Sequence, residues 1–219
     1  MAIGKRDWTA RLGRVLGMKH AYVGKISSAN HKDKYKSLLS RTPLTGMNEI
    51  EITKGFRASL FGAETVVRGV PILVYSTHIA GTAKADGSAA DFIAKSVIPK
   101  SKASSLVLLG DLNNLLGDQT LNRIEPAGMR STWSDLGIAT TRLSSHLHIE
   151  TGKESGVIDH LYSKTASGAK AIDGGVIYNA FNPLNEDKKM PRYRGEWEQF
   201  GKPLSDHRPI WAVLEFPQQ

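Results

Sequence analysis

Two places in the chain carry the residue types that metal-assisted hydrolysis of a phosphodiester requires. Asp111 and Asn113 follow one apolar run, and Asp206 and His207 precede another. Such a reaction needs a cation at the phosphoryl oxygens, a base that takes a proton from water, and donors that hold the phosphate. Carboxylates suit Mg²⁺ or Mn²⁺, an amide donates N–H groups, and histidine exchanges protons near neutral pH. The residue types therefore favour a metal-assisted phosphoesterase.

Two further segments place polar side chains in or beside apolar runs. His78 follows the run that begins at Val70, and Asp159 lies inside the run 157–162. An Asp buried in a strand costs several kcal/mol unless it is paired. We therefore expect Asp159 to have a partner, for which a histidine is the natural candidate.

These motifs, taken in order, resemble those of the endonuclease/exonuclease/phosphatase superfamily, which includes pancreatic deoxyribonuclease, abasic-site endonucleases, sphingomyelinases and inositol-polyphosphate phosphatases. The motifs are Ser76-Thr77-His78, Gly110-Asp111-Leu112-Asn113, Ile158-Asp159-His160 and Ser205-Asp206-His207-Arg208-Pro209. Weaker similarity near Leu38–Leu44 and Gly55–Leu60 extends the resemblance from about Trp8 to Phe216. The resemblance implies an α+β fold, a four-layer α/β/β/α sandwich of two mostly antiparallel sheets.

The resemblance also implies roles for the residues of these motifs. His207 would be the general base, and Asp159 would bond to its ring and fix its tautomer. Asp206 would contact a Mg²⁺ or Mn²⁺ ion, while Asp111 would position the attacking water and help to bind the metal. Asn113 would hold the scissile phosphate. A further residue, the histidine that ends the Ser-Thr-His motif, would face the leaving-group side.

The chain departs from the family pattern before its first helix. Family members normally begin with a strand that ends in Asn and a second that ends in Gln-Glu, whose Glu binds metal. Neither is visible, so the fold is expected to be N-terminally shortened. Glu49, Glu51 and Glu64 are alternative sources of that ligand, and the sequence does not choose among them.

The charge balance favours a polyanionic partner. The net charge is +8 and the sequence pI is about 9.6. One basic stretch runs from Lys19 to Lys36, and a second runs from Lys188 to Arg194 with Trp197 nearby. Basic side chains neutralise phosphates and aromatic rings stack on bases. We therefore expect nucleic acid as the partner and substrate-binding roles for Arg192, Arg194 and Trp197.

The elements that must position these residues can be read from periodicity and turn residues. Apolar residues at helical spacing predict a helix over 7–17, and a cap-like Ser88 with a stop at Pro99 predicts a second. A short helix is expected near 117–124. Strands are predicted at 56–67, 70–77, 105–109, 157–163, 175–178 and 210–216, and a long loop at 179–203. The reactive side chains would then come from strand ends and loops along one rim.

Length and composition indicate one soluble domain over residues 1–219. The 219 residues can build a sizeable core, no apolar stretch is long enough to span a bilayer, and the absence of Cys excludes disulfides. Two missing strands would leave sheet edges unpaired, so a homo-oligomer is expected. His146 and His148 form a His-x-His pair for which the sequence offers no third metal ligand.

Three functions follow from this sequence. The first is a divalent-metal-dependent phosphodiesterase that acts on nucleic acid, DNA rather than RNA, by in-line attack of water. The second keeps the fold but acts on a phospholipid head group, an inositol phosphate or another small phosphate ester. The third is a catalytically weakened binding domain, whose affinity for polyanions would fall with salt and would not depend on metal. Retention of both Asp159 and His207 favours an enzyme.

Overall fold

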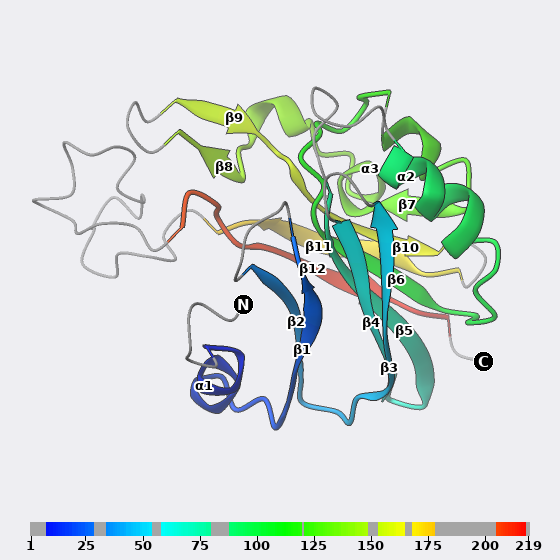
Figure 1. Cartoon of the computed structure of the whole chain (residues 1–219). Coiled ribbons are helices and arrows are strands. Elements are labelled where there is room, and N and C mark those ends of the chain that lie inside the picture. The colour runs from blue at the N-terminus through cyan, green and yellow to red at the C-terminus, as the bar shows by residue number, and fades with distance from the viewer. Residues whose placement is uncertain are drawn as a thin grey trace, which may run out of the picture.

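A six-stranded mixed sheet forms the centre of the computed structural model (Figure 1). In spatial order its strands are β3 (Thr45–Thr53), β4 (Ala58–Val67), β5 (Val70–His78), β6 (Leu106–Asp111), β10 (Asp159–Lys164) and β7 (Met129–Ser131). The structure describes residues 8–28, 34–53, 58–79, 88–119, 121–148, 153–164, 168–177 and 205–217. Among the described strands only β5 and β6 pair in parallel, so a crossover must join them. That crossover contains α2 (Ser88–Phe92) and a π-helical turn, η1 (Ile93–Val97).

The strands β4 and β5 form the hairpin that the sequence predicts. The turn residues Arg68 and Gly69 both have positive φ, 49° and 84°. Two successive residues of this kind suit the twist of a two-residue hairpin. The hairpin keeps β4 and β5 in register without a bulge from the pair Val67 and Val70 to the pair Leu60 and Thr77, one residue before the end of β5.

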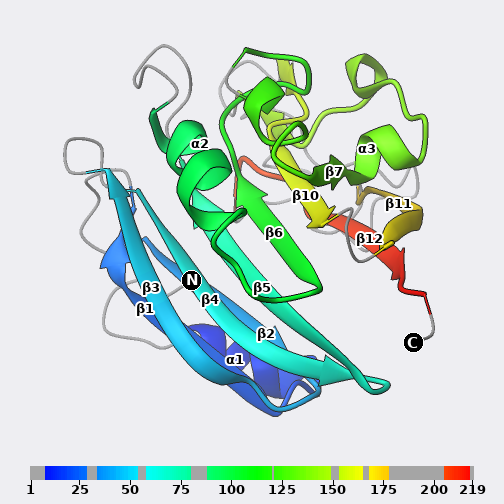
Figure 2. The ribbon, with the colours of Figure 1, turned by 90° about the vertical axis from the view of Figure 1, so that its right-hand side faces the viewer.

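The elements stack as helix, sheet, sheet and helix (Figures 1 and 2). α1 (Trp8–Val15) packs against the ladder of β1 (His20–Ser27) and β2 (Tyr35–Ser40), which packs on one face of the central sheet. α2 and η1 cover part of the other face. The expected four-layer α+β sandwich is therefore confirmed. In the described residues its second sheet consists of two separate ladders, β1–β2 and β11–β12.

Apolar side chains fill both faces of the central sheet. Leu60, Tyr75 and Leu108 are buried with the α2–η1 segment, and Phe61 and Ala63 are buried toward β2. Residues of β4 are buried on both faces through Ala63, as expected for a strand inside a sandwich. This core fixes the ends of β5, β6 and β10 relative to one another.

Several elements differ from the sequence prediction. No strand was predicted in the basic stretch that begins at Lys19, but it forms β1 and β2. The helix expected near 117–124 is a short 3₁₀ turn, η2 (Leu121–Arg123). The remaining short elements are α3 (Thr132–Asp135), η3 (Thr140–Arg142), β8 (His146–Leu147), β9 (Glu154–Gly156), β11 (Lys170–Val176) and β12 (Ile210–Glu215). None of the helices in the described ranges is long and apolar enough to cross a membrane.

Candidate active site

The strand ends of the central sheet bring His78, Asp111 and Asp159 together at one edge, called the rim below. β5 and β6 run in parallel with His78 beside Asp111, and β10 runs antiparallel with Asp159 beside Asp111. The carboxyl ends of β5 and β6 and the start of β10 therefore meet at one edge. Side chains separated by up to about 80 residues in sequence become neighbours there.

Gly110 permits the close approach of β5 and β6 just before Asp111. Its φ is +143°, and a Cβ at this position would lie 2.0 Å from the carbonyl oxygen of Thr77. Any side chain would force the two strands apart. The glycine of the Gly-Asp-Leu-Asn motif is thus explained by backbone packing, and it determines where the Asp111 carboxylate lies.

Asp159 is paired, as its place within a strand requires. The Nδ1 atom of His207 lies 2.9 Å from Asp159 Oδ2, and the Ser145 hydroxyl donates to the same oxygen at 2.7 Å. With Nδ1 bonded to the carboxylate, Nε2 of His207 is the nitrogen on the side of Asp111. The neighbouring His160 points to the opposite face, is fully buried, and contacts the Asn114 carbonyl at 2.8 Å. Strand alternation therefore separates the two residues of the Asp-His dipeptide.

Asp111 lies between two imidazole rings. Its Oδ2 is 3.3 Å from His78 Nε2 and 3.7 Å from His207 Nε2. Its Oδ1 accepts a hydrogen bond of 2.9 Å from the backbone N–H of Asn113, whose φ of 52° is left-handed. The Asn113 amide donates to the Ile79 carbonyl at 2.9 Å, and a carboxamide has a second N–H to donate.

The grouped charges change the pKa values of the site. Burial, followed by the charge of Asp159, raises the pKa of Asp111 to about 6, although the positive charge of His207 opposes this. Burial alone would lower the pKa of His207. The hydrogen bond that His207 donates to Asp159 and the charges of Asp159, Asp111 and Asp206 outweigh burial and raise that pKa to about 8. Several acidic groups thus share a limited volume with little neutralising charge, an arrangement typical of functional sites.

The chain segment 205–208 completes the rim through backbone bonds to the β8 region. Leu147 N–H donates to the Asp206 carbonyl at 3.0 Å, and Arg208 N–H donates to the Ser145 carbonyl at 2.7 Å. The buried guanidinium of Arg208 bonds the Ser144 carbonyl and the Glu154 carboxylate at 2.8 and 2.9 Å. Arg208 therefore anchors the β8–β9 hairpin to the segment that carries His207.

None of the three alternative glutamates lies in a group of metal-ligand atoms within the described residues. Both carboxylate oxygens of Glu49 are engaged: Oε2 accepts from Lys25 N and Ile26 N, and Oε1 accepts from Ser59 Oγ at 2.8 Å. Glu51 is exposed on β3. Glu49 is therefore a structural residue that links β1 to β3 and β4.

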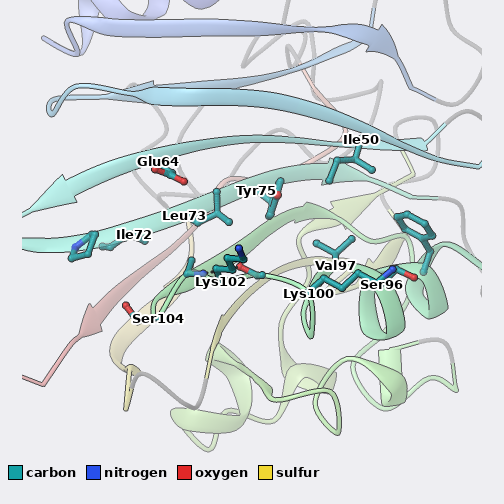
Figure 3. Close-up of a pocket in the computed structure, with 14 residues that line it drawn as sticks. Ile50, Glu64, Ile72, Leu73, Tyr75, Ser96, Val97, Lys100, Lys102 and Ser104 are labelled. Atoms are coloured by element: carbon teal, nitrogen blue, oxygen red, sulfur yellow. Dashed lines mark hydrogen bonds between the residues drawn. The ribbon is translucent and has the colours of Figure 1, made fainter.

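A cavity of about 520 Å³ lies between the central sheet and the α2–η1 segment (Figure 3). Glu64, Leu73 and Tyr75 line it from the strands, and Ser96 and Lys102 line it from η1 and the following loop. It contains none of the residues of the rim. Glu64 is therefore part of a separate surface.

The substrate-binding residues expected from the sequence, Arg192, Arg194 and Trp197, lie outside the described residues. In the first basic stretch, Lys25 and Lys34 are exposed. Lys36 was expected to add to the basic surface, but it is buried against Glu49. Its Nζ donates to the Ile26 carbonyl at 2.8 Å and to Ser28 Oγ at 3.0 Å, so it is unsuited to contact a phosphate.

Two further residues, Ser145 and His146, lie beside the site, and the sequence did not place them there. Ser145 bonds Asp159, and His146 lies beside Asp206 and His207. No local pattern marks Ser145. The His-x-His pair did mark His146, but its partners come from a segment about 60 residues away, which only the fold brings close.

The donor chemistry of the rim fits a divalent cation. Asp111 and Asp206 supply hard oxygen donors, and the repulsion between Asp111 and Asp159 is the kind of imbalance that a bound cation relieves. Two groups of metal-ligand atoms occur among the described residues: Asp111 with Asp159 and His207, and Asp206 with His146 and His207. Within each group all atoms lie within 4.8 Å of one another.

Comparisons with known proteins place this geometry in a known fold. No protein-family model and no curated protein matches the sequence. Among solved structures, an endonuclease/exonuclease/phosphatase family protein from Bacteroides thetaiotaomicron superposes with a TM-score of 0.67 at 14% identity, covering 96% of this chain and 80% of that chain. D. rerio TDP2 in complex with a single-strand DNA product superposes with a TM-score of 0.64 at 14% identity, covering 94% of this chain and 80% of that chain.

A mannosyl-6-phosphatase from Bacteroides thetaiotaomicron gives a TM-score of 0.61 at 14% identity, covering 90% of this chain and 78% of that chain. The resemblance inferred from the four motifs is thus confirmed at the level of the fold. The chain has the fold of the endonuclease/exonuclease/phosphatase proteins, and the solved chains are longer than this one.

Proposed function

We propose that the chain is a divalent-metal-dependent phosphodiesterase that hydrolyses nucleic acid, DNA rather than RNA. The observation that carries the proposal is the His207–Asp159 pair, 2.9 Å apart, with Nε2 of the same ring 3.7 Å from Asp111. A histidine oriented by a half-buried carboxylate is the arrangement of a general base. A protein that only bound polyanions would not require it.

The proposed reaction adds water across a phosphodiester. His207 Nε2 takes one proton of the water, whose oxygen forms a bond to phosphorus as the opposite P–O bond breaks. The products are a phosphomonoester and an alcohol, whose oxygen receives a proton. Asp159 stabilises the imidazolium that forms at His207. Asp111, between the two rings, is placed to orient the water.

His78 and Asn113 complete the proposed site. His78 faces the other side of Asp111 and is assigned to the leaving-group side, where its Nε2 donates to a phosphate or leaving oxygen. The second N–H of Asn113 is assigned to the scissile phosphate. A Mg²⁺ or Mn²⁺ ion held by Asp206 and Asp111 would neutralise charge on the phosphoryl oxygens.

Two observations support nucleic acid as the substrate. The net charge of +8 attracts polyanions, and D. rerio TDP2, which shares the fold, has been solved with a DNA product. The likeness to a mannosyl-6-phosphatase supports the second candidate, a phosphoesterase that acts on small phosphate esters.

Nicking of supercoiled plasmid tests the proposal. The purified chain is incubated with Mg²⁺, Mn²⁺ or EDTA beside His207→Ala and His148→Ala, an exposed histidine outside both ligand groups. We expect metal-dependent nicking that is lost in His207→Ala and kept in His148→Ala. Hydrolysis of small chromogenic phosphate esters without nicking would favour the second candidate, and salt-sensitive DNA binding without any hydrolysis would identify a binding domain.

A further inference from the structure

The fold brings His146 into contact with the Asp206-His207 motif. β8 pairs with β9, and His146 also forms a single antiparallel bridge with His207. Backbone bonds on both sides of the bridge, from Leu147 to Asp206 and from Arg208 to Ser145, hold the two segments together. The position of the His146 ring is therefore set by backbone pairing.

The side chains of His146, Asp206 and His207 converge. His146 Nε2 lies 3.5 Å from Asp206 Oδ2, and the two imidazole rings are 4.8 Å apart between centroids with planes at 61°. Each residue offers a ligand atom, and these atoms all lie within 4.8 Å of one another.

Both histidines are oriented as metal-binding histidines usually are. The Nδ1 atom of His146 lies 2.8 Å from Ser155 Oγ, and Nδ1 of His207 lies 2.9 Å from Asp159 Oδ2. An outer hydrogen bond at one ring nitrogen fixes the tautomer and presents the other nitrogen to a metal. In both rings the nitrogen left over is Nε2, on the side of Asp206 or Asp111.

We propose that His146, Asp206 and His207 form a binding site for a transition metal such as Zn²⁺. Two imidazoles and one carboxylate, with open positions, are a donor set for Zn²⁺ and other first-row metals, whereas Mg²⁺ prefers an all-oxygen set. This site differs in its donors from the Asp111 and Asp206 position proposed for Mg²⁺. The His-x-His pair of the sequence thus contributes one ligand, and the fold supplies the other two.

Occupation of this site has a consequence for hydrolysis, which rests on the proposed function. A metal bound to Nε2 of His207 uses the lone pair that would otherwise take a proton from water. It also shares Asp206 with the Mg²⁺ position. Zn²⁺ would therefore inhibit the Mg²⁺-dependent reaction, and removal of Zn²⁺ would restore it.

Zinc binding is measured on the full chain, without substrate, by competition with a chromogenic chelator. We expect one Zn²⁺ per chain, and at least about tenfold weaker binding in His146→Ala and in Asp206→Asn. His148→Ala, on the same hairpin but outside the cluster, is the matched control and should bind as the wild type does. No zinc binding, or equal losses in His146→Ala and His148→Ala, would overturn the proposal.

A measurement without substitutions covers the case in which a variant does not fold. In ¹⁵N-histidine NMR spectra of the wild type, Zn²⁺ should shift the Nε2 resonances of two histidines, and unchanged spectra would count against the site. Because these readouts need no substrate, their failure leaves the proposed hydrolysis unaffected. Conversely, if zinc binds but plasmid is not nicked with Mg²⁺, the site stands and the proposed function fails.

Discussion

At the scale of single residues, the direction of each side chain decides its use. Asp159 and His160 are adjacent in sequence, yet Asp159 faces the rim and His160 is buried on the opposite face. Burial lowers the pKa of His160, so its ring is neutral and structural. Asp206 and His207 are also adjacent in sequence, but both face the rim. They can do so because they precede β12 and do not lie within a strand.

Removing the charge of Asp159 tests the base at residue scale. Asp159→Asn keeps the size of the side chain but no longer stabilises an imidazolium at His207. We expect kcat for hydrolysis to fall by about 10² to 10⁴ with little change in KM. Steady-state kinetics with Mg²⁺ measures this, with Asp173→Asn on the exposed part of β11 as the control. Equal activity of the two variants would show that Asp159 does not act through His207.

The pKa of His207 predicts a pH dependence of stability in the metal-free protein. Its folded pKa of about 8 lies above the ordinary value of 6.5. The contribution of His207 to the free energy of unfolding is therefore complete below pH 6.5 and is lost as the pH rises through about 8. It amounts to at most about 2 kcal/mol. The groups that face the ring are Asp159, Asp111, Asp206 and His146.

Thermal unfolding in EDTA between about pH 6 and 8.5 measures this effect. The wild type should lose more stability across this range than His207→Gln, which lacks the titrating ring. Asp111 also has a raised pKa, but its window lies lower, between 3.8 and about 6. Parallel pH profiles for the wild type and the variant would contradict the prediction.

At the scale of elements, the Lys36 and Glu49 pair joins the two sheet layers. Glu49 on β3 bonds the backbone of β1 and Ser59 of β4, and Lys36 on β2 lies 3.7 Å from the same carboxylate. Burial lowers the pKa of Lys36, while the charge of Glu49 opposes this. The network therefore stabilises the packing of the β1–β2 ladder on the central sheet only while both charges are present.

Loss of Glu49 should destabilise this packing strongly. Glu49→Ala leaves Lys36 charged and buried and leaves two backbone N–H groups without an acceptor. We expect the free energy of unfolding to fall by about 3 to 5 kcal/mol. Chemical denaturation measures it, with Glu51→Ala at an exposed position of the same strand as the comparison, which should cost much less. A loss below about 1 kcal/mol in Glu49→Ala would mean that the network stabilises little.

At the scale of the whole molecule, net charge governs encounter with a polyanion. With 29 basic and 21 acidic residues, the chain should bind DNA less tightly as salt increases, because phosphate contacts release counterions. We expect affinity for a duplex oligonucleotide in EDTA to fall at least tenfold from about 50 to about 200 mM salt. Fluorescence anisotropy measures it, and affinity independent of salt would argue against a polyanionic partner.

The separate two-stranded ladders suggest self-association. β12 alternates between half-buried and exposed residues, with Trp211 and Val213 at 40% and 43% exposure. Unpaired strand edges beside exposed apolar side chains favour pairing with another chain. We propose a homo-oligomer and expect light scattering at micromolar concentration to give at least twice the chain mass of 23.9 kDa. A strictly monomeric species would exclude it.

Local sequence signals were sufficient to predict part of the fold and of the candidate site. Glycine-containing turns, apolar alternation and the four motifs are short-range signals, so β4, β5, β6 and the residues of the rim could be predicted from them. Long-range pairing decided the rest. The neighbours of Asp159, the burial of Lys36 and the place of His146 depend on contacts between segments far apart in the chain. No local pattern encodes such contacts, because they exist only after the strands have packed into layers.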